Sequence, residues 1–201
     1  MVNYYVMELP TYIIGIDEAG RGPLAGPVSV GAVKVSSDFD IAFFDGIRDS
    51  KQISERVREE WFARIKGETQ IAYAVSLISA SVIDRSGIVP SVRLGIARVL
   101  SRLAADPKTT MVYLDGGIKA PEAFSMQETI IKGDTLVPLI SAGAIMAKVT
   151  RDRYMQKIAP QYPQYGLEIH KGYGTKAHRE AIFQFGPSKI HRKSFLSGFV
   201  G

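Results

Sequence analysis

The sequence contains no cysteine, so neither a disulfide framework nor a thiolate metal site can form. Its most apolar later stretch, residues 136–147, is short and interrupted by Pro138 and Gly143, and residues 1–10 lack the basic segment of a secretion signal. We therefore expect a cytoplasmic protein without a membrane segment. Internal repeats and long linkers are also missing, so the chain of 201 residues predicts a single domain over residues 1–201.

Positive charge is concentrated in the last third of the chain. Residues 141–201 contain 10 Lys and Arg against 3 Asp and Glu, whereas residues 1–140 contain 15 against 17. Such a basic region is typical either of a solvated surface or of a surface that binds a polyanion such as nucleic acid. Charge alone does not separate these two interpretations.

Apolar periodicity predicts an alternation of strands and helices. Strand patterns cover residues 12–16, 28–35, 70–78, 110–114 and 129–131, and helical patterns cover residues 54–66, 90–103, 138–158 and 175–185. The predicted class is α/β, with a mixed five-stranded sheet flanked by helices and a helical C-terminal part.

Four acidic residues follow apolar runs in a way that predicts strand ends. Asp17 and Glu18 close the run at residues 12–16, Asp115 follows MVYL, and Asp134 follows TIIKG. If these acids converge, each pair at about 4 Å repels by about 4 kcal/mol at an effective dielectric of about 20, so the cluster needs cations. Oxygen ligands suit Mg²⁺ or Mn²⁺. Alternatively each acid begins a turn independently, and spacing does not decide between the two.

Six short motifs, in this order, resemble those of the ribonuclease HII family. They are GIDEAGRGPLAGPV from residue 15, DSK at 49–51, YLDGG at 113–117, KGD at 132–134, AKVTRDR at 147–153 and HKGYGT at 170–175. The resemblance implies a ribonuclease H-like fold and an endonuclease that cuts the RNA strand of RNA/DNA hybrids. It also implies cleavage 5′ of single ribonucleotides embedded in duplex DNA, leaving 3′-hydroxyl and 5′-phosphate ends.

The same resemblance implies roles for the four acids. The family's metal-binding residues match Asp17, Glu18, Asp115 and Asp134, which would hold two Mg²⁺ or Mn²⁺ ions, with Asp17 as the bridging ligand. Two such ions lower the pKa of a bound water and offset charge on the leaving oxygen, so no protein general base is required.

Recognition of the ribose 2′-hydroxyl falls, in this family, to a GRG segment and a tyrosine. The matching residues are Gly20, Arg21, Gly22 and Tyr173. Lys51 and Lys148 match positions that face the nucleic-acid backbone. Without the resemblance, an ordinary turn and a packed aromatic ring would be the favoured explanations of the GRG segment and Tyr173, and an ordinary solvated lysine is the alternative for Lys51 and for Lys148.

The three histidines are expected to be hydrogen-bonded structural residues rather than metal ligands. Two departures from the family pattern concern its helix at residues 138–158: Gly143 costs up to about 1 kcal/mol relative to alanine, and Ala144 lacks a hydroxyl group. Neither departure affects an expected metal ligand.

Three other functions compete with this interpretation. Ribonuclease HIII shares the catalytic fold but carries an additional N-terminal domain. A non-catalytic module that grips hybrid duplexes would not need four acids, because acids repel phosphate without metals. A phosphatase for small substrates would leave the basic region and the GRG segment without a role. We expect a monomer, and the C-terminal KSFLSGFVG contains no convincing docking motif for a sliding clamp.

Overall fold

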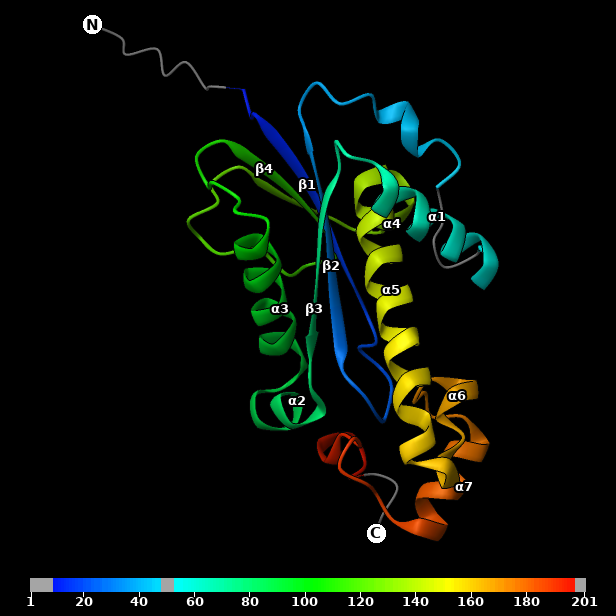
Figure 1. Cartoon of the computed structure of the whole chain (residues 1–201). Helices are drawn as coiled ribbons and strands as arrows, with labels where there is room; N and C mark the ends of the chain where they lie inside the picture. Colours follow the sequence, from blue (N-terminus) through cyan, green and yellow to red (C-terminus); the bar gives the residue numbers. More distant parts are fainter. Residues whose placement is uncertain (1–8, 48–52, 198–201) are drawn as a thin grey trace, which may run out of the picture.

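The computed structural model describes residues 9–47 and 53–197, and a five-stranded sheet forms its centre (Figure 1). The strands are β1 (Tyr12–Ala19), β2 (Val28–Ser36), β3 (Ala72–Ile78), β4 (Thr110–Asp115) and β5 (Gln127–Ile130). They lie in the order β3-β2-β1-β4-β5. β1 pairs antiparallel with β2 and parallel with β4, so the predicted mixed sheet is confirmed.

Helices cover both faces of this sheet. They are α1 (Glu55–Gly67), α2 (Ala80–Ser86), α3 (Ile88–Arg102), α4 (Gly133–Leu136), α5 (Pro138–Ile158), α6 (Leu167–His170) and α7 (Lys176–Phe185), with short 3-10 turns at Ile41–Phe44, Ala159–Gln161, Pro163–Tyr165 and Lys193–Phe195. Figure 1 shows α3 on one face and α5 on the other. Within the described ranges, no helix is both long and apolar enough to cross a bilayer.

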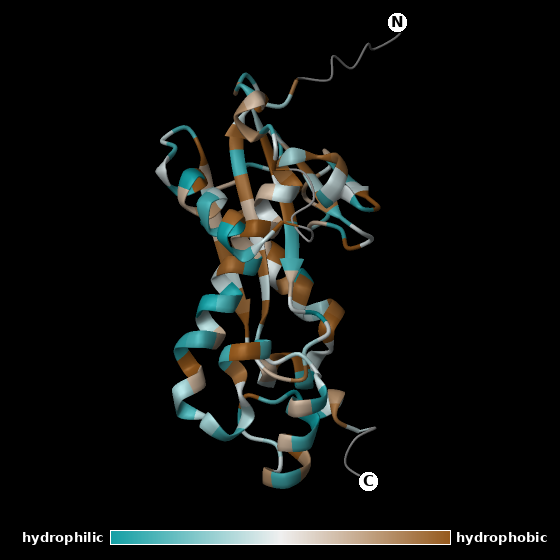
Figure 2. Cartoon of the chain, turned by 90° about the vertical axis from the view of Figure 1, so that its right-hand side faces the viewer, coloured by the Kyte–Doolittle hydropathy of each residue, from teal (hydrophilic) through white to brown (hydrophobic). Residues whose placement is uncertain are grey.

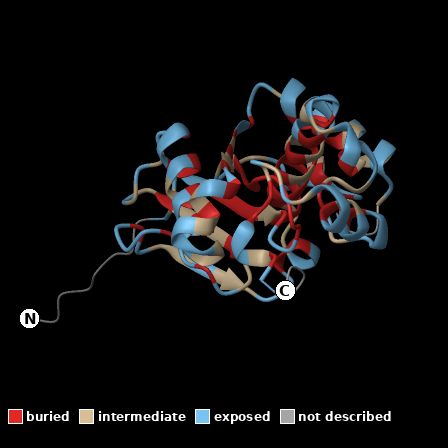
Figure 3. Cartoon of the chain, turned by 90° about the horizontal axis from the view of Figure 1, so that it is seen from below, coloured by how far each residue is buried: buried red, intermediate tan, exposed pale blue. Residues whose placement is uncertain are grey.

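The alternation of side chains along β1 divides the core into two layers. Ile14 and Ile16 pack with Val92 and Ile96 of α3, whereas Ile13 packs on the other face, in the layer that contains Leu139 of α5. Figure 2 shows hydrophobic residues concentrated in the central strands, and Figure 3 shows buried segments at the centre of the molecule with exposed segments around them. Odd-numbered residues of β1 therefore face α5.

Glycines bring α5 into backbone contact with the sheet. A Cβ on Gly15 would lie 2.2 Å from the carbonyl carbon of Leu139, and one on Gly31 would lie 2.3 Å from the carbonyl oxygen of Gly143. A Cβ on Gly143 would in turn lie 3.0 Å from the carbonyl oxygens of Gly15 and Gly31. Close packing thus explains why α5 contains Gly143. This glycine lowers the helix propensity of α5, but a larger residue there would prevent the backbone contact with the sheet.

Several element boundaries differ from the sequence-based expectation. β1 continues to Ala19, so Asp17 and Glu18 lie inside the strand rather than beyond its end. Asp134 was expected at a strand end but lies in the first turn of α4, because β5 already ends at Ile130. The short helix α2 was not predicted, since seven residues are too few for a clear helical period.

The C-terminal part forms a third, smaller cluster beside the end of α5. Leu24 and Ala25, from the connection between β1 and β2, pack there with Met155, Leu167 and Ile182. α7 has the expected boundaries, because the Thr175 hydroxyl caps its first turn by accepting from the amide of His178 at 3.3 Å. The β1–β2 connection is therefore enclosed by the helical C-terminal part.

Candidate active site

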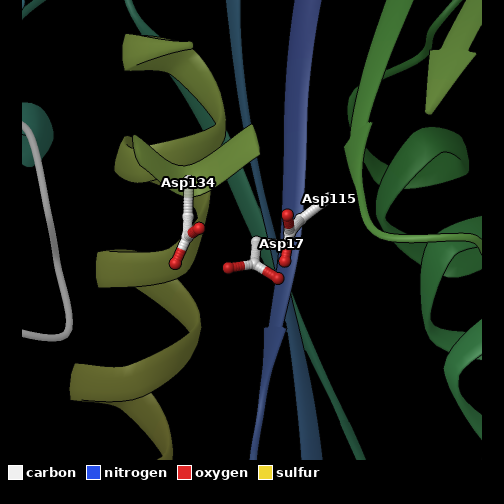
Figure 4. A group of neighbouring side chains, drawn as sticks. All are labelled: Asp17, Asp115 and Asp134. Carbon is white, nitrogen blue, oxygen red and sulfur yellow. The ribbon is translucent and has the colours of Figure 1, made fainter. Parts of the chain in front are cut away.

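Three aspartates meet near the C-terminal ends of the neighbouring strands β1 and β4. Each of Asp17, Asp115 and Asp134 offers a carboxylate oxygen, and the three oxygens lie within 4.8 Å of one another. Figure 4 shows the three carboxyl groups pointing toward a common centre, Asp17 from β1, Asp115 from the end of β4 and Asp134 from the side of α4 and α5. The convergence that spacing alone left open is present in the structure.

Strand register places two of these acids side by side. The parallel ladder of β1 and β4 ends with Ile16 opposite Leu114, so Asp17 and Asp115 occupy the next position on neighbouring strands. Residues at the same level of a parallel pair point to the same face of the sheet, which here is the face covered by α5. Their proximity therefore follows from the sheet and not from a flexible loop.

The position of Asp134 depends on a hydrogen bond made by Asp115. The Asp115 side chain accepts a hydrogen bond from the amide of Gly133 at 2.7 Å, which fixes the start of α4. Lys132, just before it, adopts a left-handed conformation with φ of 57°, so the chain turns sharply between β5 and α4. The Ser141 hydroxyl of α5 donates to the backbone carbonyl of Asp134. Asp134 is thus directed inward from a short helix.

Crowding and burial disfavour negative charge at this cluster. Burial raises the pKa of Asp17 well above its usual value of 3.8, and the neighbouring carboxylates of Glu18 and Asp115 raise it further. The donor set consists of carboxylate oxygens, which is the chemistry preferred by Mg²⁺ and Mn²⁺. A divalent cation would relieve this repulsion, so these residues fit a metal site.

Glu18 lies beside the cluster rather than within it. Successive side chains of a strand leave from opposite faces, so Glu18 starts from the face opposite Asp17. Its carboxylate forms an ion pair with Arg21 at 3.1 Å, and it still contributes to the raised pKa of Asp17. Of the four predicted metal ligands, the structure therefore brings three within mutual reach and places the fourth alongside.

A cleft of about 330 Å³ opens beside the acids and contains most of the predicted substrate residues. Its lining is Asp17, Glu18, Ala19, Gly20, Arg21, Arg58, Asp115, Ala144, Lys148 and Tyr173. The lining of a larger, open hollow of about 850 Å³, over residues 119–129, includes none of the predicted site residues. The cleft beside the acids is therefore the candidate active site.

The expected substrate residues differ in how they are held. Lys148 pairs with Asp152 at 3.0 Å, and its Nζ lies 5.4 Å from the centre of the Tyr173 ring, which is 40% exposed. Gly22 is exposed and adjoins the cleft through Arg21. Lys51 lies outside the described residues. Four of the six expected substrate residues thus line one surface with the acids.

Sequence reasoning missed Arg58 as part of this cleft. Arg58 belongs to α1, and its guanidinium also donates to the carbonyl of Ile53. Along the sequence it is one of several charged residues of an amphipathic helix, and nothing in that pattern separates it from Arg56 or Arg64. Only the packing of α1 beside α5 brings it to the acids.

The histidines form a buried hydrogen-bonded chain, as expected for structural residues. His178 Nδ1 lies 2.9 Å from the carbonyl oxygen of Tyr173, and its Nε2 lies 3.1 Å from Nε2 of His191. Burial and, to a smaller extent, the neighbouring His178 lower the pKa of His191 from its usual 6.5 to about 4. Both rings are therefore neutral at pH 7, and His178 donates to Tyr173 while accepting from His191.

Comparisons with known proteins identify the family of this chain. The family model described as Ribonuclease HII matches residues 14–197. Ribonuclease HII of Ruminiclostridium cellulolyticum is 44% identical over 94% of this chain and 71% of its own length. A chain in the structure of the PCNA:RNase HII complex from Archaeoglobus fulgidus has a TM-score of 0.72 and 26% identity, covering 90% of this chain and 93% of that one.

A more distant neighbour shares the fold only. Bst-RNase HIII in complex with Mn²⁺ has a TM-score of 0.66 and 20% identity, covering 94% of this chain and 66% of that one. The sheet order and flanking helices described above are thus those of a ribonuclease H-like fold.

Proposed function

Because the chain belongs to the ribonuclease HII family and is a ribonuclease H, we propose that it cuts the RNA strand of RNA/DNA hybrids and nicks duplex DNA 5′ of single embedded ribonucleotides. The products would carry 3′-hydroxyl and 5′-phosphate ends. The observation that carries this proposal is the convergence of Asp17, Asp115 and Asp134 at the cleft that also contains Gly20, Arg21 and Tyr173.

The acids are the proposed metal ligands. Asp17, Asp115 and Asp134 would hold Mg²⁺ or Mn²⁺ between them, and Glu18 would complete the second of two sites after releasing Arg21. When bound, such ions activate a water molecule and offset negative charge on the leaving 3′ oxygen. The chain's own contribution is to hold the carboxylates in register on β1 and β4, so that little reorganisation is needed at the moment of reaction.

Substrate recognition is assigned to the rest of the cleft. In the segment Gly20-Arg21-Gly22, the two glycines would allow the backbone to approach the ribose, because they have no side chain. Tyr173 would stack on the neighbouring sugar. Lys148 and Arg58, on opposite helices of the same cleft, are placed to contact phosphates, as is expected of basic residues that position a duplex without reading its sequence.

The whole chain is proposed to act as one catalytic domain and as a monomer. The PCNA complex is a property of the relative from Archaeoglobus fulgidus. The predicted absence of a clamp-docking motif at the C-terminus stays a prediction, because residues 198–201 lie outside the described part.

The deciding experiment uses an end-labelled DNA duplex with one ribonucleotide, incubated with Mg²⁺ or Mn²⁺. We expect one nick directly 5′ of the ribonucleotide, no cut in the all-DNA duplex, and loss of the nick on chelation with EDTA. Tight binding without a nick would favour the hybrid-binding module instead. A nick at other positions would contradict the proposed recognition.

A tyrosine pair tests the assignment of Tyr173. Tyr173→Ala should lose preference for the single ribonucleotide over a fully RNA/DNA hybrid, because the stacking surface is removed. Tyr154→Ala is the matched control: Tyr154 is similarly exposed, at 36%, but does not line the cleft. Equal preference in the two variants would remove Tyr173 from the site.

A further inference from the structure

Two fully buried arginines lie beneath the β1–β2 loop, which we define as residues 20–27. Arg151 comes from α5 and Arg192 from the tail segment, defined as residues 188–195, and both are 0% exposed. Arg151 donates through Nε to the carbonyl of Pro27 at 2.9 Å and through Nη2 to that of Ala25 at 3.2 Å. Backbone carbonyls, and not carboxylates, are thus the hydrogen-bond acceptors for this buried charge.

Arg192 binds the loop closer to the acids. It donates through Nη2 to the carbonyl of Gly20 at 2.7 Å, through Nη1 to that of Arg21 at 2.8 Å and through Nε to that of Gly26 at 2.9 Å. Its own amide donates to the carbonyl of Leu24 at 2.8 Å. One residue of the tail therefore fixes both ends of the loop.

These bonds determine where the loop amides point. In a planar trans peptide the carbonyl of one residue and the amide of the next point in opposite directions. The carbonyls of Gly20 and Arg21 face the buried Arg192, so the amides of Arg21 and Gly22 face away from it. Both residues are exposed, and in the described part of the chain neither amide donates to another protein group. The amides of Arg21 and Gly22 therefore point to the solvent-exposed side of the loop, where they can donate to a ligand.

The tail also holds Tyr173. His191 precedes Arg192 and lies 3.1 Å from His178, which in turn donates to the carbonyl of Tyr173 at 2.9 Å. The backbone directly after Arg192 is fixed from α2, since Asp84 accepts from the amides of Lys193 and Ser194 at 3.0 and 2.9 Å. Consecutive residues of the tail therefore reach the two parts of the cleft expected to recognise ribose.

We propose that Arg192 is a positioning residue for ribonucleotide recognition, which holds the amides of Arg21 and Gly22 toward the sugar in register with Tyr173. This inference rests on the proposed function and adds to it the residue that sets the geometry. Arginine is required because three donors in a planar fork meet three carbonyls at once, which the single ammonium of lysine cannot do.

The test measures discrimination rather than activity. Each protein carries Asp17→Asn, so that the duplex stays uncut, and the dissociation constant is measured for a duplex with one ribonucleotide and for the matched all-DNA duplex. The ratio of interest is the dissociation constant for the all-DNA duplex divided by that for the ribonucleotide duplex. We expect Arg192→Lys to reduce this ratio by about tenfold, which is the effect of losing one or two aligned hydrogen bonds. Affinity for the all-DNA duplex should change little, because charge is retained.

A control separates positioning from general stability. Arg102→Lys removes a guanidinium bonded to the carbonyl of Val75, at a distance from the loop, and should keep the ratio, whatever its melting temperature. A merely structural Arg192 would lower both affinities together and leave the ratio unchanged, and that result would overturn the assignment to Arg192.

Failure of the proposed function has a different signature. If the protein with native Arg192 does not prefer the ribonucleotide duplex at all, the function itself is wrong; if it prefers it and Arg192→Lys keeps the full ratio, only the positioning role is wrong. If Arg192→Lys does not fold, Arg192→Gln is measured in its place. In addition, the backbone amide signals of the protein with native Arg192 are recorded by nuclear magnetic resonance with each of the two duplexes bound. The amides of Arg21 and Gly22 must then shift between the two duplexes, and unchanged signals would overturn the inference.

Discussion

Two groups of like charges lie beside the loop that follows β1, and the fold accommodates them differently. The acids Asp17, Asp115 and Asp134 face one another, whereas the guanidiniums of Arg151 and Arg192 face backbone carbonyls. Burial, and after it a neighbouring like charge, raises the pKa of Asp17 well above 3.8 and lowers that of Arg192 to about 9.

The difference distinguishes a structural charge from one that awaits a ligand. A buried arginine that donates to several carbonyls stabilises one loop conformation, and removing it leaves those carbonyls without donors. A cluster of carboxylates that repel one another destabilises the fold until a cation arrives. Removing one member of each group should therefore change stability in opposite directions.

Asp17→Asn should give the largest effect and raise stability as it abolishes catalysis. We expect the nicking rate to fall at least about 10³-fold, roughly 4 kcal/mol of transition-state stabilisation, because the proposed central metal ligand is lost. Without metal, the melting temperature should rise, since one buried charge is removed. Asp38→Asn, at an exposed position, is the control and should change neither quantity. A lower melting temperature for Asp17→Asn would break the comparison.

Arg151→Met should change stability in the other direction. The carbonyls of Ala25 and Pro27 lose their donor, which costs about 3 kcal/mol or roughly 6–12 °C in melting temperature for a chain of this size. Urea unfolding followed by circular dichroism measures it, with the exposed Arg85→Met as control, expected within about 0.5 kcal/mol of the unmodified protein. Equal stability of the two variants would mean that the buried guanidinium of Arg151 does not stabilise the β1–β2 loop.

Added Mn²⁺ should stabilise only through the acids. At one hundred times its dissociation constant, a ligand of the folded state contributes about 2.7 kcal/mol. We expect calorimetry to detect this increase in the unmodified protein and in Arg151→Met but to find it much reduced in Asp17→Asn. The same increase in all three proteins would place the ion elsewhere.

Lowering the pH should reduce the free energy of unfolding through His191 of the tail segment, and this effect is the smallest of those predicted. The folded protein lowers the pKa of His191 from 6.5 to about 4, so below pH 6.5 the unfolded chain binds the proton more readily. The stability that this histidine contributes is complete above pH 6.5 and declines as the pH falls toward 4. His191→Gln should flatten that part of the curve of unfolding free energy against pH. An unchanged slope would show that other groups cause it.

The sequence predicts the sheet and the acids well because their signals are local. Apolar runs mark the strands, and Pro138 at the first turn marks the start of α5, whose boundaries match the expectation. Asp115 ends its apolar run and ends β4. The position of Asp134 in a helix was missed, because the four residues of α4 follow from the hydrogen bond between Asp115 and Gly133 and not from any period of their own.

Contacts between distant segments lie beyond such patterns. Arg192 meets the carbonyl of Arg21 across 171 residues, and Arg58 reaches the cleft only because α1 packs against α5. A lone arginine in the tail looks like any surface charge until the loop that it binds is known. The resemblance to a family supplies residue roles, but it does not supply the residues that orient them.

The parallel register of β1 and β4 has a consequence for how this enzyme tolerates change in length. Asp17 stands beside Asp115 because each is the first residue after the pair Ile16 and Leu114. Adding or deleting one residue upstream in either strand would exchange the sides of the sheet, sending the acid into the apolar layer beneath α3. Substitutions within these strands can be accommodated by repacking, whereas an insertion or deletion there would abolish activity even if the protein still folded.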